Sequence, residues 1–88
     1  MKGDFGPRQL EAINQQIAKG ERAIHAQRRV LATLRRLGKP TEQAERLLAG
    51  SALIQRRFLQ DREAMVATIE RREAQTRRAA QRRQRRGA

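Results

Sequence analysis

The sequence predicts an all-α protein, an antiparallel two-helix hairpin of the coiled-coil type. Two observations predict this fold class. Apolar residues recur at intervals of three and four along two long stretches, as on helices that pack along a narrow seam. The segment between the stretches, Gly38-Lys39-Pro40-Thr41, is too short to connect anything but antiparallel neighbours. We expect an irregular lead-in at 1–7, helices at about 8–37 and 42–73, a turn at 38–41 and an Arg-rich extension, helical or disordered, at 74–88.

The first helix is predicted from a seven-residue repeat that begins after Pro7, a residue that suits a first helical turn. Gly20 and Gln27 occupy two positions of this repeat without being apolar. Gly38 fits a left-handed C-terminal cap, and Pro40 cannot continue the helix. The apolar members of the repeat are Leu10, Ile13, Ile17, Ile24, Leu31 and Leu34.

The second helix is predicted to begin at Thr41, a good N-cap. Glu42 and Glu45 then place negative charge where the helix dipole favours it. The apolar stripe of this helix has a period nearer 3.6 than 3.5, because Leu47, Phe58 and Ile69 are spaced by eleven residues. The stripe comprises Ala44, Leu47, Leu48, Ser51, Ile54, Phe58, Met65 and Ile69.

Folding about Lys39-Pro40 pairs residue i with roughly residue 79 − i. This rule sets Gly20, which has no side chain, against Phe58, the largest residue of the second stripe. It sets Gln27 against Ser51, a polar pair that would fix the register. The predicted seam therefore contains Leu10, Ile13, Ile17, Gly20, Ile24, Leu31, Leu34, Leu47, Ile54, Phe58, Met65 and Ile69.

A hairpin of about seventy residues gains only a few kcal/mol from its core. Cysteine is absent, so neither a disulfide nor a thiolate metal site can add stability. Further apolar residues flank the seam, and we expect them to be covered by a second copy in a four-helix bundle or by a partner on which the hairpin docks. These residues are Ala23, Val30, Leu37, Leu48 and Leu53.

The formal net charge of +12 is unevenly distributed along the 88 residues. Residues 41–73 carry six basic and six acidic side chains, whereas residues 74–88 carry six arginines and no acid. Arginines along a helix can neutralise several phosphates in a sequence-independent, salt-sensitive way. The predicted nucleic-acid contacts are the arginine doublets of both helices: Arg28, Arg29, Arg35, Arg36, Arg71, Arg72, Arg77, Arg78, Arg82, Arg83, Arg85 and Arg86.

Residues suited to catalysis are not grouped in this sequence. His25 is the only histidine and has no serine or cysteine at a useful spacing. We therefore expect no enzyme activity, no cofactor and no bound metal. The apolar runs are far shorter than a membrane span, and Met1 to Pro7 lacks the apolar core of a secretory signal, which predicts a cytoplasmic location.

Three short motifs are spaced along the chain. The first is residues 17–22 (IAKGER) with Ile24 and Gln27; the second is Gly38, Thr41, Ala44 and Leu47-Leu48; the third is Asp61-Arg62 with Met65. They resemble the opening motif, the turn with the start of the second helix, and the closing motif of a family of short, uncharacterised bacterial helical-hairpin proteins that is common in alphaproteobacteria. The resemblance covers about 13–69 and implies the hairpin fold but no activity; where this chain has Phe58 the family often has histidine.

Two functions remain open from the sequence. The first is a small accessory protein that binds the phosphates of RNA or DNA through its Arg-rich end. We expect little sequence preference, because Phe5 and Phe58 are the only aromatic residues and form no stacking platform. The second is a protein-interaction hairpin that dimerises or docks its apolar seam on a larger acidic partner.

Overall fold

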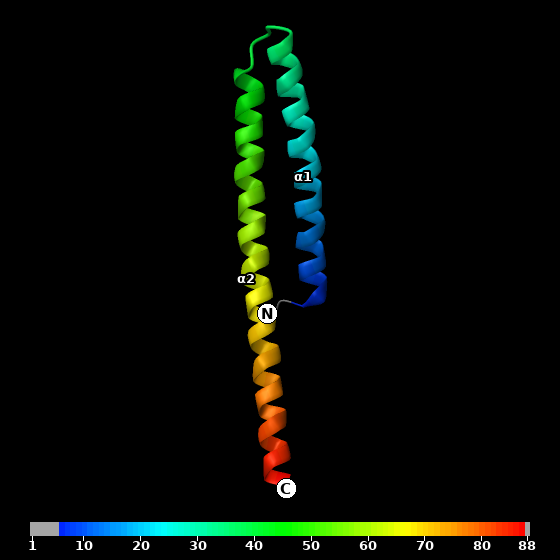
Figure 1. Cartoon of the computed structure of the whole chain (residues 1–88), viewed down its shortest axis with the longest axis vertical. Helices are drawn as coiled ribbons and strands as arrows, with labels where there is room; N and C mark the ends of the chain where they lie inside the picture. Colours follow the sequence, from blue (N-terminus) through cyan, green and yellow to red (C-terminus); the bar gives the residue numbers. More distant parts are fainter. Residues whose placement is uncertain (1–5, 88) are drawn as a thin grey trace.

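The computed structural model describes residues 6–87 and consists of two helices. Helix α1 spans Pro7–Arg36 and helix α2 spans Glu42–Gly87. They pack antiparallel in an extended hairpin that measures 77 × 22 × 15 Å (Figure 1). The predicted all-α hairpin is thus confirmed. Most of the predicted lead-in, residues 1–5, and the final Ala88 lie outside the described residues.

Helix α1 begins at Pro7, whose fixed φ suits the first helical position. The backbone N–H of Gly6 donates to Oε1 of Gln9 (2.8 Å), and the N–H of Leu10 donates to the carbonyl oxygen of Gly6 (3.2 Å). The side chain of Gln9 therefore satisfies a backbone donor at the helix start that the helix itself leaves unpaired.

The turn after α1 is built on Gly38, which has φ 68°. The N–H of Gly38 donates to the carbonyl of Arg35 (3.1 Å), and the N–H of Lys39 donates to that of Leu34 (2.9 Å). These two bonds form a Schellman motif, in which the residue after the helix end takes the left-handed conformation that glycine adopts without strain. The expectation that Gly38 caps the first helix is confirmed.

Helix α2 begins directly after Pro40 and Thr41, and the N–H of Glu45 donates to the carbonyl of Thr41 (2.9 Å). Glu45 also accepts a hydrogen bond from Nη2 of Arg35 (3.2 Å), which joins the last turn of α1 to the first turn of α2. Helix α2 then continues past residue 73 to Gly87, so the Arg-rich segment is helical rather than irregular. Neither helix, over the residues described, contains an apolar stretch long enough to cross a membrane.

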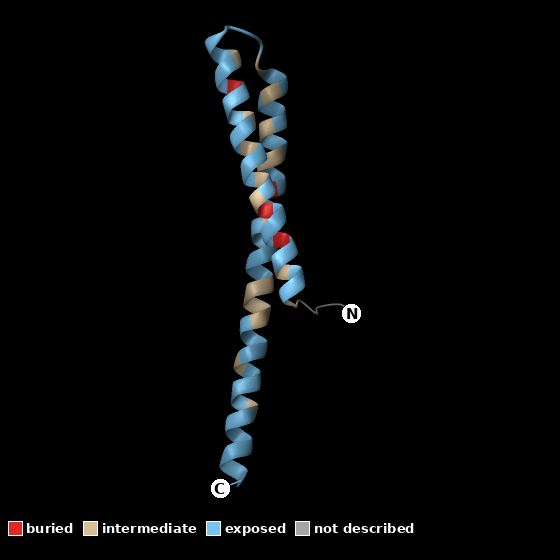
Figure 2. Ribbon diagram, turned by 90° about the vertical axis from the view of Figure 1, so that its right-hand side faces the viewer, coloured by how far each residue is buried: buried red, intermediate tan, exposed pale blue. Residues whose placement is uncertain are grey.

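The seam of α1 lies where the seven-residue repeat predicts it. Ile13, Ile17 and Leu31 are the buried apolar residues of the described chain. The other members of the repeat are half-buried, while most residues between them are exposed (Figure 2). These half-buried members are Leu10, Gly20, Ile24, Gln27 and Leu34.

The seam of α2 differs from the prediction at two residues. The apolar stripe predicts Leu47 and Ile54 in the seam, but they are 60% and 59% exposed. The α2 residues withdrawn from solvent along this side follow the same intervals of three and four as α1, with Gln55 buried among them. The apolar stripe misleads because Gln55, a polar residue, occupies a seam position. The seam residues of α2 are Ala44, Leu48, Ser51, Gln55, Phe58, Met65 and Ile69.

The register of the hairpin is also shifted by about one turn from the prediction. Gly20 lies against the side-chain amide of Gln55, not against Phe58, and a Cβ added at Gly20 would overlap that amide. Gln55 hydrogen-bonds to the backbone of the same turn of α1, at Ile17. The predicted polar pair of Gln27 with Ser51 fails too, because Oε1 of Gln27 is buried and accepts no hydrogen bond. The contact of Gly20 with Gln55 defines a register in which each step forward along α1 is matched by a step back along α2. In this register Ile17 is level with Phe58, and Gln27 is level with Leu48.

Candidate phosphate-binding surface

The last part of α2 extends beyond the hairpin as a single helix. The register set by Gly20 and Gln55 brings Pro7, the first residue of α1, level with Thr68. Residues 69–87 therefore continue alone for about 28 Å, at 1.5 Å per residue. Figure 1 shows this single-helix extension below the end of α1. Because no second helix of the chain covers it, nearly every one of its side chains is exposed.

The arginines of this extension gather on one side of the helix. At 3.6 residues per turn, all but Arg77 fall within an arc of roughly 160°. Glu70 and Glu73, the last two acidic residues of the chain, lie on the opposite side. Residues 74–87 contain no acidic side chain. We call this arc the arginine face; it comprises Arg71, Arg72, Arg78, Arg82, Arg83, Arg85 and Arg86.

Two threonine hydroxyls form hydrogen bonds near the base of the arginine face. Oγ1 of Thr68 donates to the carbonyl of Ala64 (2.9 Å) and accepts from Nη2 of Arg71 (3.2 Å). Oγ1 of Thr76 likewise donates to the carbonyl of Arg72 (2.9 Å). All three bonds join residues of α2 to each other.

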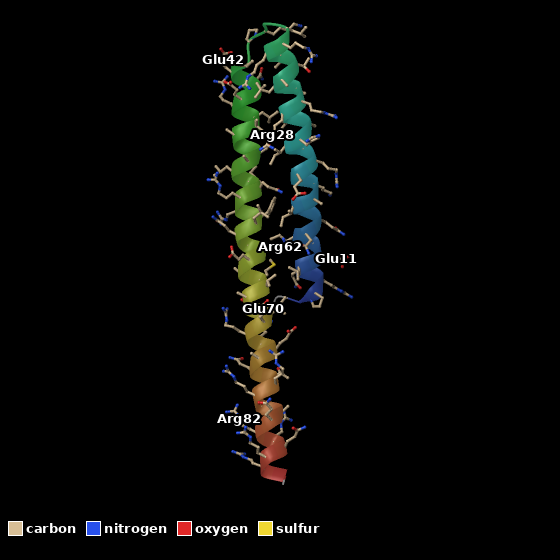
Figure 3. All side chains as sticks on the ribbon, in the orientation of Figure 1. Glu11, Arg28, Glu42, Arg62, Glu70 and Arg82 are labelled. Carbon is tan, nitrogen blue, oxygen red and sulfur yellow. The ribbon has the colours of Figure 1, made fainter. Side chains whose placement is uncertain are left out.

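The predicted arginines of α1 belong to a different part of the molecule. Arg28, Arg29, Arg35 and Arg36 are exposed, but they lie beside the turn half of the hairpin. Arg28 is level with Leu47, and from there to Arg71 the helix rises about 36 Å. Figure 3 shows Arg28 within the two-helix part and Arg82 within the extension. The structure thus does not bring the two predicted sets of arginines into one surface, and Arg35 already pairs with Glu45.

A second surface is apolar, and the sequence predicted it in part. Val30, Leu37 and Leu53 are exposed as expected, whereas Leu48 is half-buried in the seam. Two exposed aliphatic residues belong to α1, Val30 (56%) and Leu37 (58%), and two belong to α2, Leu47 (60%) and Ile54 (59%). A further exposed residue, Leu53, lies on the outer edge of α2, about 180° around the helix from the seam. Recognising Gln55 as a seam residue would have placed Leu47 and Ile54 outside the seam, because each lies one position from a seam residue of α2.

Potential metal ligands do not cluster: within residues 6–87, no three histidine or acidic side chains lie together in a way that could hold a metal ion. Comparison of the chain with protein-family models, with curated proteins and with solved structures finds no match. The resemblance to the bacterial hairpin family therefore stays a prediction, and the function is argued from the two surfaces alone.

Proposed function

We propose that this protein binds the phosphates of nucleic acid through the arginine face of α2, without catalysis. The observation that carries the proposal is the juxtaposition of seven arginines on one side of a helical extension about 28 Å long that α1 does not cover. Guanidinium groups form bidentate hydrogen bonds with phosphate oxygens. A straight, exposed helix can follow a phosphate backbone over several nucleotides.

The binding proposed here is electrostatic. Each phosphate neutralised by an arginine releases condensed counterions, so the logarithm of the affinity falls linearly with the logarithm of the salt concentration. Four to six contacts give a slope of roughly −3 to −5. Sequence preference is slight because Phe58 is half-buried in the seam and the extension itself contains no aromatic residue to stack on a base.

The experiment compares two variants with the same net charge. In the first, Arg77, Arg78, Arg82, Arg83, Arg85 and Arg86 are replaced by glutamine. In the second, six arginines of the hairpin are replaced instead: Arg8, Arg22, Arg29, Arg36, Arg46 and Arg56. Affinity for duplex and single-stranded oligonucleotides is measured by fluorescence anisotropy from low to moderate salt.

The first variant should lose most of its affinity and its salt slope should flatten. The second should retain a slope close to that of the unaltered protein, because the arginine face is intact. Equal losses in both variants would mean that net charge alone attracts the nucleic acid. Tight binding that ignores salt would refute the proposal.

A second function is favoured by a separate observation, the exposed aliphatic residues of the hairpin. In this alternative the hairpin contacts a protein, either a second copy of itself in a four-helix bundle or a larger acidic partner. Only three apolar residues of the described chain are buried, so covering further apolar surface would stabilise the fold. A protein contact of this kind would survive removal of residues 74–88, whereas phosphate binding would not.

A further inference from the structure

The hairpin is a layer one helix thick, with two broad faces. One face is marked by the ion pair of Arg35 with Glu45, which joins α1 to α2 across the seam (3.2 Å). On α1, Val30 and Leu37 lie about 200–220° around the helix from Arg35. On α2, Leu47 and Ile54 lie about 180–200° around from Glu45. These four exposed aliphatic residues therefore share the other face, opposite the ion pair.

The four residues form a continuous strip across both helices. The register sets Leu47 level with Arg28 and Ile54 level with Glu21, so the strip extends from Leu37 to Ile54 over about 24 Å. Between them on the same side of α1 lie Ala23, Ala26 and Thr33, which are short and uncharged. We call this set the neutral strip; it comprises Ala23, Ala26, Val30, Thr33, Leu37, Leu47 and Ile54.

The surface of the neutral strip is indented where a helix of a partner would insert side chains. Ala26, Arg29, Val30 and Thr33 border a hollow on α1, at the spacing of a hole that receives a knob in helix bundles. A second hollow, on α2, shares Ile54 with the strip but extends away from it, and its other lining residues include Leu53, Arg56 and Arg57. The strip therefore offers shape as well as apolar area to a second helical layer.

The charge of the chain indicates which partner fits. An acidic protein would be drawn to the arginines, and no lysine or arginine belongs to the neutral strip. A second copy presents the same uncharged strip, and a self-complementary patch is what a two-fold dimer requires. One hairpin is only 15 Å thick, whereas a stable domain needs two packed layers around its core. Stacking two hairpins supplies the second layer.

We propose that two copies of this chain stack through their neutral strips, with their arginine faces at opposite ends of the dimer. A two-fold axis perpendicular to the helices would cross the strip near Val30, so α1 of one copy packs antiparallel on α1 of the other. In each copy, the C-terminal end of α2 then lies about 60 Å from the axis. The alternative axis, parallel to the helices, would place two extensions rich in arginine side by side, which their repulsion disfavours.

This inference rests on the protein-contact function proposed above and is independent of phosphate binding. Its test uses single cysteines, because the chain has none of its own. Val30 lies near the proposed axis, so the two copies of Val30→Cys should form an intermolecular disulfide under mild oxidation. Leu37→Cys lies about 10 Å from the axis along each copy, which separates the two sulfurs by about 20 Å. Leu59→Cys lies on the opposite face; neither of these two controls should cross-link.

The unaltered protein is measured in parallel by sedimentation and by small-angle X-ray scattering. The proposal expects a dimer about 120 Å long, against 77 Å for one hairpin. Replacing Val30 and Leu47 together by glutamine should weaken dimerisation by about tenfold or more, while Leu59→Gln should leave it unchanged. Circular dichroism reports whether each variant remains helical.

Three outcomes would overturn the inference. A helical monomer at tens of micromolar would remove the second copy as the partner, with the affinity for nucleic acid left untouched. A dimer no longer than one hairpin would contradict the antiparallel arrangement. A dimer that resists the substitutions at Val30 and Leu47 and cross-links through Leu59→Cys would keep self-association but move it to the other face.

Discussion

The side-chain amide of Gln55 donates a hydrogen bond to the backbone carbonyl oxygen of Ile17, across the seam from α2 to α1 (2.8 Å). A helical carbonyl has a second lone pair, so it can accept this bond in addition to its own helical one. Gln55 is 7% exposed, and its amide lies over Gly20, where the absence of a side chain leaves room for it. One buried polar residue is thereby attached to one particular turn of α1, which specifies the register of the hairpin.

We expect Gly20→Ala to destabilise the hairpin. The added methyl group would overlap Oε1 and Cδ of Gln55, so the amide would have to move. Moving it breaks the hydrogen bond to Ile17 and leaves polar atoms buried without a partner. This loss exceeds the roughly 0.5–1 kcal/mol that alanine gains over glycine inside a helix, and the net loss should be about 1–2 kcal/mol. Urea unfolding monitored by circular dichroism measures it.

Gly50→Ala is the matched control for that substitution. Gly50 also lies inside a helix, but no atom lies within 4 Å of a Cβ added there. Only the helix propensity changes, so this variant should be more stable by about 0.5–1 kcal/mol. If both substitutions shifted the unfolding midpoint in the same direction, the contact of Gly20 with Gln55 would have no energetic significance.

Replacing Gln55 by glutamate should make the hairpin more stable at acid pH than at neutral pH. At neutral pH a buried carboxylate would face the carbonyl oxygen of Ile17, and two acceptors repel one another. Burial raises the pKa of such a carboxyl above its unfolded value. The protonated form can donate to Ile17, so the stability is present at low pH and is lost as pH rises through the raised pKa. Unfolding at pH 4 and pH 7 should differ by about 2–3 kcal/mol in favour of pH 4.

The contrast with a second substitution makes this prediction specific. Gln60→Glu adds the same charge at an exposed position of α2 and should show no such gain at acid pH. A Gln55→Glu variant that was as stable at pH 7 as at pH 4 would show that residue 55 is not buried against α1.

The two helices were not equally predictable from the sequence. In α1 six of the eight repeat positions are isoleucine or leucine, so hydrophobic spacing alone identified the seam. In α2 the seam includes Ser51 and Gln55, whereas Leu47 and Ile54 face solvent. The amide nitrogen of Gln55 is held in the seam by a hydrogen bond to a backbone carbonyl 38 residues away. No local pattern contains that contact.

The candidate surfaces show a similar division. The arginine face can be predicted from sequence because its residues are close in the chain and helical geometry alone gathers them. The neutral strip cannot, because it combines Val30 and Leu37 of α1 with Leu47 and Ile54 of α2. Their alignment depends on the register, and the apolar stripe of α2 places Leu47 and Ile54 in the seam because Gln55, a polar residue, is not recognised as a seam residue.

Gly38→Ala should destabilise the turn by about 1 kcal/mol. Gly38 has φ 68°, and an L-residue with a Cβ is strained in this left-handed conformation. Nothing lies within 4 Å of a Cβ added there, so the effect is confined to the backbone. Gly38→Asn should lose less, because asparagine tolerates this conformation better than alanine. Thermal unfolding of the two variants ranks them; equal losses would indicate that backbone strain at Gly38 is not the cause.

Removing residues 71–88 should leave the hairpin almost as stable as before. The register places these residues beyond the first residue of α1, so their helical structure depends on propensity and on continuity with the rest of α2. The midpoint of thermal unfolding should therefore change by no more than about 2 °C, which corresponds to a few tenths of a kcal/mol. Binding to oligonucleotides should be lost, since the whole arginine face has been removed.

The comparison variant for this prediction lacks residues 1–13 instead. That deletion removes Leu10 and Ile13, which are half-buried and buried in the seam, and exposes the facing part of α2. It should lower the free energy of unfolding by about 2 kcal/mol or more, while the arginine face is retained. If loss of residues 71–88 proved the more damaging of the two, the extension would have to contact the hairpin, either within the chain or from a second copy, and it could not serve as a free surface for phosphates.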